Sequence, residues 1–237
     1  MNTARRFIVA VVVAMFLLAA HPVIAATADK DLDRVLRQLD QAAKNFHSTS
    51  ADFEYDSIET DPVYDKDVQK GTVYYQRNGS FQMAAHIDEH NGKPAPKIYT
   101  YSSGVFKLYE VGIDQVTVFG KANRFESYLM LGFGASGKDL AEKWEIKYLG
   151  PETLPDGSKS VKTEKLELVA KDPEVRKNIP KVIIWMDVER GVSLKQRFEE
   201  GPEQFRECFY FNFKVNQPIA ASLFTFKTDK NTQTVNR

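Results

Sequence analysis

The segment His86-Ile87-Asp88-Glu89-His90 gathers two imidazoles and two carboxylates, the side chains that bind zinc. Side chains alternate along a strand, so His86 and His90 would share a face. A zinc site needs three or four ligands that converge in space, and no other segment has ligand spacing. The segment runs into the polar pair Asn91-Gly92, so we predict the tip of a hairpin and no metal site. A metal-dependent hydrolase stays open as an alternative.

A glycine motif, Gly132-Phe133-Gly134-Ala135-Ser136-Gly137, has the G-x-G-x-x-G spacing of dinucleotide-binding loops. Such a loop binds pyrophosphate when it joins a parallel strand to a full helix in a βαβ unit. Here the preceding segment looks helical, and the helix that follows has barely two turns. We therefore predict a flexible loop and no nucleotide or other cofactor.

Residues for nucleophilic catalysis are few. The sequence has no G-x-S-x-G motif, and Cys208 is the only cysteine, in no reactive context. After the N-terminal segment, His47, His86 and His90 are the only histidines. We do not expect an enzyme, and a single cysteine cannot form an internal disulfide.

The N-terminal segment has the pattern of a cleavable signal peptide. Arg5 and Arg6 precede an apolar run of about 14 residues, shorter than the roughly 20 that span a bilayer. Small residues follow, as at signal-peptidase sites. We predict a signal peptide at residues 1–25, with cleavage after Ala25 or as late as Ala28, and a single periplasmic domain at 26–237.

Charge and composition exclude several partners. Lysine and arginine balance aspartate and glutamate at 32 each, and loss of Arg5 and Arg6 leaves the mature chain at about −2. Nucleic acid and anionic membrane surfaces attract basic proteins, so neither is an expected partner. No second apolar stretch approaches membrane length, and we expect a monomer without stable membrane insertion.

The period of the apolar residues predicts a helix followed by many strands. Six residues form one stripe on a helix over Asp31–Asn45, which Asp29 or Asp31 could cap: Leu32, Val35, Leu36, Leu39, Ala43 and Phe46. The period then changes to two, which predicts strands at Ala51–Ile58, Gly71–Gln76, Phe81–His86, Ile98–Tyr101, Val105–Val111, Gln115–Phe119, Trp144–Leu149, Lys165–Ala170, Lys181–Asp187, Val192–Phe198 and Glu203–Val215.

Two regions give predictions of their own: the segment between Lys121 and Lys143, and the last strand. Alternation breaks between Lys121 and Lys143, where Phe125, Tyr128, Leu129 and Leu140 suggest two short helices around the glycine loop. In the last strand, alternation divides the side chains between two faces. One face would carry Phe205, Phe209, Phe211, Phe213 and Val215, and the other Arg206, Tyr210, Asn212 and Lys214.

Short strands at this spacing predict a mainly β fold, an antiparallel sheet that curls on itself with a few helices on one face. So few helices cannot cover all the large side chains on the inner face of the sheet, which favours an apolar cavity there. An ordinary filled core is the alternative. The predicted cavity residues are Leu36, Phe53, Tyr55, Val73, Tyr75, Phe81, Met83, Phe106, Trp185, Phe209, Phe211 and Phe213.

Between about Leu32 and Lys227, several motifs follow in order. They are Phe46-His47-Ser48 with Ala51-Asp52-Phe53; Gly71-Thr72-Val73-Tyr74-Tyr75-Gln76-Arg77 with Phe81; Ser103-Gly104 with Leu108-Tyr109 and Gln115-Val116-Thr117; Leu166-Glu167-Leu168 with Asp172-Pro173; Ile184-Trp185-Met186-Asp187; and Asn216-x-Pro218 with Leu223-Phe224-Thr225-Phe226. Together they resemble the LolA-like family of outer-membrane lipoprotein carriers.

The resemblance implies an incomplete β-barrel with a helical lid over an apolar cavity for lipoprotein acyl chains. It also implies an inner-membrane LolCDE-type ABC transporter as donor and an outer-membrane LolB-type acceptor. Arg77 matches the family's lid latch, an arginine that hydrogen-bonds lid backbone. Asn78 stands where the family has proline, and Asp229-Lys230 replaces a Pro-Gly pair. A periplasmic sensor module, or a carrier of another lipid, is the alternative on the same fold.

Overall fold

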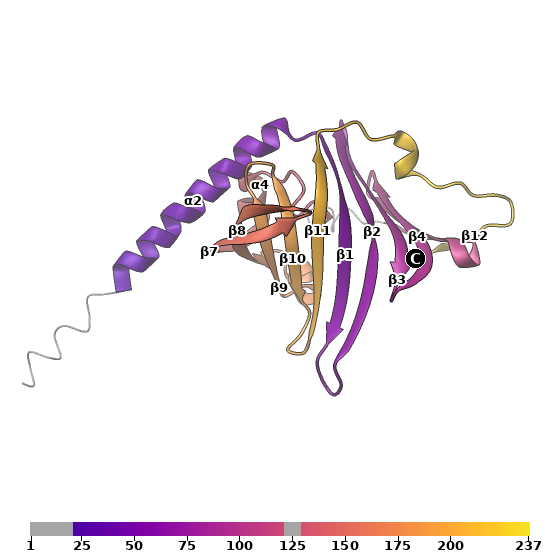
Figure 1. Ribbon diagram of the computed structural model, residues 1–237, viewed down its shortest axis with the longest axis horizontal. Coiled ribbons are helices and arrows are strands. Elements are labelled where there is room, and N and C mark those ends of the chain that lie inside the picture. Colours follow the sequence, from indigo (N-terminus) through magenta and orange to yellow (C-terminus); the bar gives the residue numbers. More distant parts are fainter. Residues whose placement is uncertain (1–20, 121–128) are drawn as a thin grey trace, which may run out of the picture.

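The computed structural model describes residues 21–120 and 129–237, so most of the predicted signal peptide lies outside the described residues. The described part is dominated by one sheet of twelve strands in the order β12-β6-β5-β4-β3-β2-β1-β11-β10-β9-β8-β7 (Figure 1). Neighbouring strands are antiparallel except β12 and β6, which are parallel. The strands are β1 Ser48–Glu59, β2 Asp65–Asn78, β3 Ser80–His90, β4 Lys93–Ser102, β5 Val105–Glu110, β6 Gln115–Phe119, β7 Trp144–Asp156, β8 Lys159–Ala170, β9 Lys181–Asp187, β10 Val192–Glu199, β11 Gln204–Val215 and β12 Gln233–Asn236.

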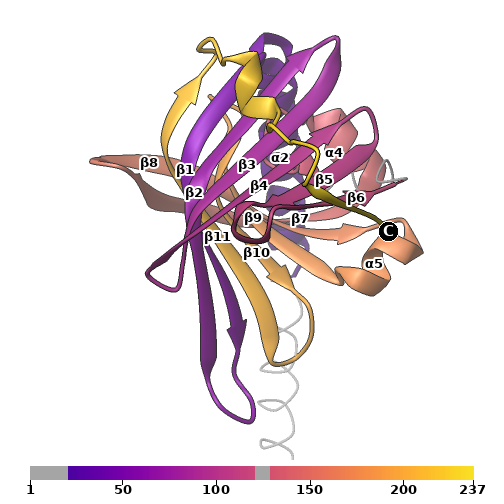
Figure 2. The ribbon, with the colours of Figure 1, turned by 90° about the vertical axis from the view of Figure 1, so that its right-hand side faces the viewer.

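The sheet is strongly curved and does not close. Its two edge strands, β7 and β12, are not paired with each other. Figure 2 shows the strands spread as a curved fan, with α2 on the far side of the sheet. Each predicted strand has a counterpart among β1–β11, so the predicted fold class, a mainly β incomplete barrel with a few helices, is confirmed.

The helices are α2 (His21–Asn45), α4 (Gly137–Lys143), α5 (Pro173–Asn178) and the short 3-10 helices η1 (Val111–Ile113) and η3 (Ala221–Phe224). The long helix begins ten residues before the predicted Asp31, so Asp29 and Asp31 lie inside it rather than capping it. The second of the two short helices predicted around the glycine loop is α4; the first falls mainly on residues outside the described range. None of the helices in the described residues has the length and apolar content to cross a membrane.

Two apolar clusters hold the sheet and helices together. In one, Val35 and Leu39 of α2 are fully buried against α4, β8 and β9. The other lies on the inner face of the sheet and joins β1–β4 to β10 and β11 through residues such as Phe53, Tyr75 and Tyr210. Burial of apolar surface on this scale is the main source of stability for a chain whose only cysteine is unpaired.

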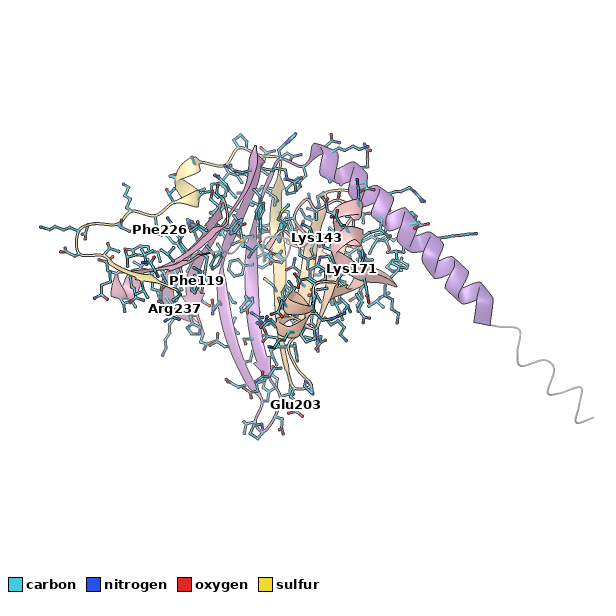
Figure 3. All side chains as sticks on the ribbon, turned by 180° about the vertical axis from the view of Figure 1, so that it is seen from behind. Phe119, Lys143, Lys171, Glu203, Phe226 and Arg237 are labelled. Carbon is cyan, nitrogen blue, oxygen red and sulfur yellow. The ribbon has the colours of Figure 1, made fainter. Side chains whose placement is uncertain are left out.

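Backbone hydrogen bonds fix the C-terminus and an internal segment to the edges of the sheet. The backbone N–H of Arg237 donates to the Val118 carbonyl at 2.9 Å, so Phe119 and Arg237 lie close together (Figure 3). At the other edge, the N–H of Lys171 donates to the Lys143 carbonyl at 3.0 Å. The segment before β12 crosses the outer face, where Phe226 stacks on Tyr109 with ring centroids 5.1 Å apart.

The predicted facing of β11 is wrong over half of the strand. Cys208 and Tyr210 belong to the inner cluster, so Phe209 between them points outward, under the ammonium of Lys195. Asn212 then adopts a left-handed φ of 57°, where the register with β1 shifts. One extra residue in a strand reverses the alternation beyond it, which returns Phe213 to the inner cluster.

Candidate functional site

An apolar cavity of about 360 Å³ lies inside the curve of the sheet. Its lining residues come from β1–β5, β10, β11 and the segment that precedes α4. They are Phe53, Tyr55, Gln69, Val73, Tyr75, Met83, Ala85, Ile87, Tyr99, Phe106, Leu129, Gln196, Phe198, Arg206, Cys208 and Tyr210. The structure thus brings together six of the twelve predicted cavity residues: Phe53, Tyr55, Val73, Tyr75, Met83 and Phe106.

Two further predicted residues adjoin this cavity. Phe81 stacks on Tyr75 with centroids 6.0 Å apart and lines a neighbouring crevice. Phe213 packs on the edge of the inner cluster, 6.4 Å from Tyr210. Both therefore belong to the wall around the cavity rather than to its lining.

The remaining four predicted residues lie elsewhere, so their predicted place in the cavity is wrong. Leu36 contacts Gly137 of α4 through its backbone. Trp185 points to the outer face, where its indole N–H donates to Glu152 at 2.8 Å. Phe209 and Phe211 line a separate crevice beneath the β7–β8 hairpin. In β9 and β11, apolar residues occupy both faces, and alternation alone could not tell which face is concave.

The segment of residues 129–137, here called the plug, covers one side of the cavity. Phe133 is 1% exposed and stacks on Tyr75 with ring centroids 3.8 Å apart. It also meets Tyr210 edge to face, at 5.0 Å. Leu129 of the plug lines the cavity directly. The plug therefore occupies space that the curved sheet alone would leave open.

Backbone hydrogen bonds fix the plug in place, so the predicted flexible loop is wrong. The N–H of Gly134 donates to the Gly191 carbonyl at 2.9 Å, and the N–H of Ser193 donates to the Gly132 carbonyl at 2.8 Å. The amide of Gln196 donates to the Leu131 carbonyl at 2.6 Å. Pairing of this kind satisfies backbone groups that burial removes from water.

The glycines of the plug explain the G-x-G-x-x-G pattern as close packing. A Cβ on Gly132 would lie 2.5 Å from the Ser193 Cβ, and Gly132 has a left-handed φ of 80°. A Cβ on Gly134 would lie 2.2 Å from the ring of Phe46. A Cβ on Gly137 would lie 2.1 Å from a backbone oxygen of α2. Only glycine allows the plug to approach the sheet and α2 this closely.

Arg77 reaches the plug from β2. Its Nη2 donates a hydrogen bond to the Gly134 carbonyl at 3.2 Å, and its backbone N–H donates to the His47 carbonyl at 2.8 Å. The side chain thus bonds to backbone of the covering segment, the contact expected of a lid latch. A guanidinium keeps its charge and needs acceptors where it meets an apolar region.

One side of the cavity is polar. Arg206 donates from Nη1 to the Tyr55 hydroxyl at 3.1 Å and forms an ion pair with Glu200 in the β10–β11 turn. Burial raises the pKa of Tyr55, and the charge of Arg206 offsets part of this rise. The Tyr55 hydroxyl is therefore protonated near pH 7 and can donate a hydrogen bond. The cavity is amphipathic, with aromatic and aliphatic walls and one cationic corner.

Cys208 lies in the wall of the cavity and is 4% exposed. Burial raises the pKa of its thiol to about 12, so almost no thiolate forms near pH 7. Because the thiolate is the reactive form, the burial of Cys208 protects its thiol from alkylation. The thiol is a natural reporter of cavity opening.

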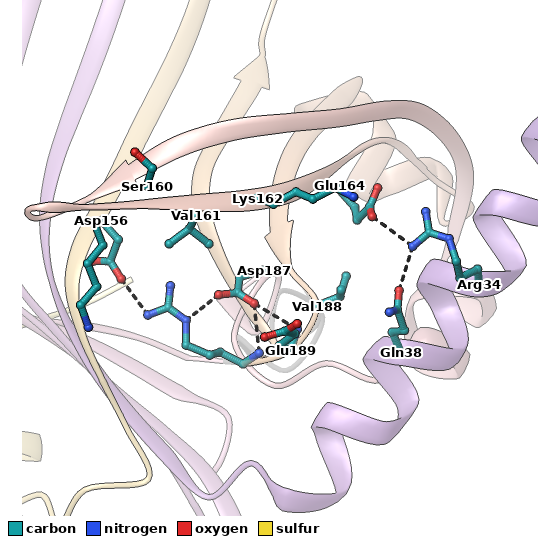
Figure 4. A pocket seen from close by; sticks show the side chains of 12 residues that line it. Arg34, Gln38, Asp156, Ser160, Val161, Lys162, Glu164, Asp187, Val188 and Glu189 are labelled. Atoms are coloured by element: carbon teal, nitrogen blue, oxygen red, sulfur yellow. Dashed lines mark hydrogen bonds and ion pairs between the residues drawn. The ribbon is translucent and has the colours of Figure 1, made fainter.

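A larger cavity of about 500 Å³ between α2, β8 and the β9–β10 turn is polar (Figure 4). Arg34 of α2 donates to Glu164 of β8 at 3.0 Å and to Gln38 at 2.9 Å. Arg190 forms ion pairs with Asp187 and, at 2.7 Å, with Asp156 at the tip of the β7–β8 hairpin. These pairs attach α2 and the hairpin to the sheet and do not suit an apolar ligand.

Glu164 makes this attachment sensitive to acid. Burial alone would raise the pKa of Glu164, but hydrogen bonds from Tyr148 and Arg34 outweigh it, so the pKa is lowered. A carboxylate with a lowered pKa stabilises the fold above its ordinary pKa of 4.5, and this contribution is lost as the pH falls through the folded-state value.

We expect Glu164→Gln to lower the free energy of unfolding by about 1–2 kcal/mol at pH 7, because a charged hydrogen-bond acceptor is lost. At pH 3, below the ordinary pKa of 4.5, the carboxyl of the unfolded chain is protonated and the stabilisation from the lowered pKa is partly lost, so the difference should shrink. Urea unfolding of both proteins at the two pH values measures it. An equal difference at pH 7 and pH 3 would show that the effect comes from shape rather than charge.

The histidines of the candidate metal segment have other partners. His86 Nε2 lies 2.8 Å from the Leu223 carbonyl, and His90 Nε2 lies 2.6 Å from Asp67 Oδ2. The turn between β3 and β4 falls at Asn91-Gly92, which confirms the predicted hairpin tip. Within residues 21–120 and 129–237, no group of three or more histidine, cysteine or acidic side chains could hold a metal ion.

Comparison with known proteins adds evidence on the fold alone. No protein-family model and no curated protein matches the sequence. An uncharacterized conserved protein from Thermus thermophilus aligns with a TM-score of 0.52 at 11% identity, over 86% of this chain and 98% of that one. MucB aligns with a TM-score of 0.51 at 12% identity, over 87% of this chain and 66% of that one.

A LolA superfamily protein, NE2245 from Nitrosomonas europaea, also aligns, with a TM-score of 0.41 at 13% identity over 82% of this chain and 97% of that one. The likeness of fold rests on the first two structures. The open antiparallel sheet, its apolar hollow and the segment that covers it define an incomplete β-barrel, the fold class that the sequence predicted.

Proposed function

We propose that the mature chain is a periplasmic carrier that binds acyl chains in its apolar cavity and moves them between membranes, and is not an enzyme. The observation that carries this proposal is the cavity of about 360 Å³, which the side chains of the described residues leave unfilled. Each methylene removed from water contributes about 0.8 kcal/mol, so an acyl chain needs such a cover to cross an aqueous compartment.

A carrier must also release its cargo, and the plug offers a way. For the plug to leave, its 3.2 Å hydrogen bond from Arg77 must break together with its backbone hydrogen bonds to Gly191 and Ser193, and these bonds reform when the plug returns. In the proposed cycle the signal peptide at residues 1–25 directs export to the periplasm. A LolCDE-type ABC transporter then loads lipoprotein acyl chains into the cavity. Displacement of the plug at the outer membrane transfers them to a LolB-type acceptor.

The carrier role is tested with the mature chain, residues 26–237, and two vesicle populations. Donor vesicles carry a fluorescent diacylated peptide, and acceptor vesicles carry a quencher. We expect the rate of transfer to rise in proportion to protein concentration. A rate that equals the spontaneous rate at every concentration would contradict the proposal.

A protein-binding role is the second candidate, because MucB shares the fold over most of this chain and has also been solved, from Pseudomonas aeruginosa, in complex with MucA. About a third of MucB lies outside the alignment. Under this candidate, the chain would capture a protein segment and leave the rate of lipid transfer unchanged. The vesicle assay therefore separates the two candidates.

A further inference from the structure

The charge of the cavity lining is asymmetric. Among the described residues that line the cavity, Arg206 is the only cation, and none is an acid. All the other lining residues are apolar or neutral. A bound molecule would therefore meet one positive group at the edge of an apolar space. An uncharged hydrocarbon chain makes no use of that group.

Arg206 occupies a defined place in this lining. It pairs across the sheet with Ser57 of β1 and Phe198 of β10, and its guanidinium lies 6.0 Å from the ring of Phe198. The Tyr55 hydroxyl, 3.1 Å from Nη1, adds a second donor beside it, and Gln69 lies opposite Tyr55 on β2. A planar guanidinium beside a hydroxyl matches the oxygens of a carboxylate or phosphate.

Glu200 already presents a carboxylate to this corner. It comes from the β10–β11 turn, and its Oε1 forms the ion pair with Arg206. The side chains of Glu200 and Arg206 are each a little under one-third exposed, so the pair lies at the cavity rim rather than deep within it. An incoming acid group could replace the Glu200 carboxylate without leaving Arg206 uncompensated.

We propose that Arg206 and Tyr55 bind the anionic head group, a carboxylate or a phosphate, of a single-chain amphiphile whose tail fills the apolar cavity. The inference rests on the proposed function, because it requires that an acyl chain enters this cavity. The cavity volume of about 360 Å³ lies within the roughly 300–1,000 Å³ found for ligand pockets. Glu200 acts as the internal competitor of the head group.

The test measures displacement of the neutral fluorescent probe N-phenyl-1-naphthylamine from the mature chain at pH 8. The competitors are palmitate, hexadecyl phosphate and the uncharged methyl palmitate. We expect wild type to bind one of the two acids about tenfold more tightly than the ester. Arg206→Gln should remove this preference, and Arg206→Lys should keep part of it. Glu200→Gln should tighten binding of the acid, because the competing carboxylate is gone.

Arg197→Gln is the matched control, because Arg197 pairs with Glu199 and Glu207 on the outer face. It should leave the preference unchanged. A preference for acid that survives in Arg206→Gln would overturn the inference and leave the carrier proposal standing. If neither the acids nor the ester displaced the probe, the carrier proposal itself would fail. The stronger of the two acids identifies the head group.

Discussion

Replacing Phe133 with alanine is expected to lower the free energy of unfolding by about 3–5 kcal/mol, the usual cost of truncating a buried phenylalanine. Phe133 is 1% exposed and lies between the rings of Tyr75 and Tyr210. Its loss removes two aromatic contacts and leaves a void that the β-sheet cannot collapse to fill. Urea unfolding followed by circular dichroism gives the value.

The same substitution should enlarge the apolar cavity. A saturating long-chain amphiphile is therefore expected to restore part of the lost stability in Phe133→Ala, and to restore more than it adds to wild type. Tyr64→Ala is the matched control, since Tyr64 is 63% exposed in the β1–β2 turn. A loss in Phe133→Ala no larger than that of the control would show that the plug is not part of the packed cover.

Arg77→Leu is expected to raise the rate at which Cys208 is alkylated by about ten- to 150-fold, because a charged hydrogen bond of this kind contributes about 1.5–3 kcal/mol to the closed state. Removal of the bond to Gly134 lets the plug leave the cavity more often. The exposed thiol then meets solvent and ionises more readily. The measurement is the mass-shift rate with a maleimide at pH 7.5.

The proposal that Arg77 is the lid latch also predicts how Arg77→Leu changes the rate of lipid release. If Arg77 favours the closed, empty state, its loss should slow transfer of bound lipid to acceptor vesicles. Arg37→Leu, on the exposed side of α2, serves as the control. Release as fast as in wild type, together with an unchanged alkylation rate, would remove the assigned role of Arg77.

The strands could be predicted because the pattern of this chain is locally clear. Phe53 and Tyr55 alternate with acidic residues in β1, and glycine turns separate the strands that follow. Apolar residues at every second position, with polar residues between them, are typical of a half-buried strand. The β7–β8 hairpin beyond Leu149 and the parallel β12 were missed, because neither carries a continued alternation of apolar residues.

The candidate site was only partly predictable, for two physical reasons. A bulge such as that at Asn212 has no strong signature in sequence, yet it reverses the facing of every residue beyond it. Ala85 and Ile87 could have been predicted as lining residues, because they continue the inward alternation of Phe81 and Met83. Arg206 could not have been predicted as a lining residue, because the predicted facing of β11 placed Arg206 on the side away from the cavity.

The plug shows a different limit. Its glycines are flanked by elements that do not form the βαβ unit of a dinucleotide-binding loop. Their actual role depends on surfaces from Phe46, Ser193 and α2, far away in the chain. Glycine spacing alone cannot distinguish a mobile loop from a segment that must pack closely.

Mass spectrometry of the lipids that co-purify with the mature chain tests most directly whether the cavity holds an acyl chain. Ala85 lines the cavity on β3, so Ala85→Trp should fill it, whereas Asp88→Trp places the same ring on an exposed position of that strand. We expect acyl lipid to co-purify with wild type and with Asp88→Trp in equal amounts, and little with Ala85→Trp. Equal lipid in all three folded proteins, or none in wild type, would contradict an acyl-binding cavity.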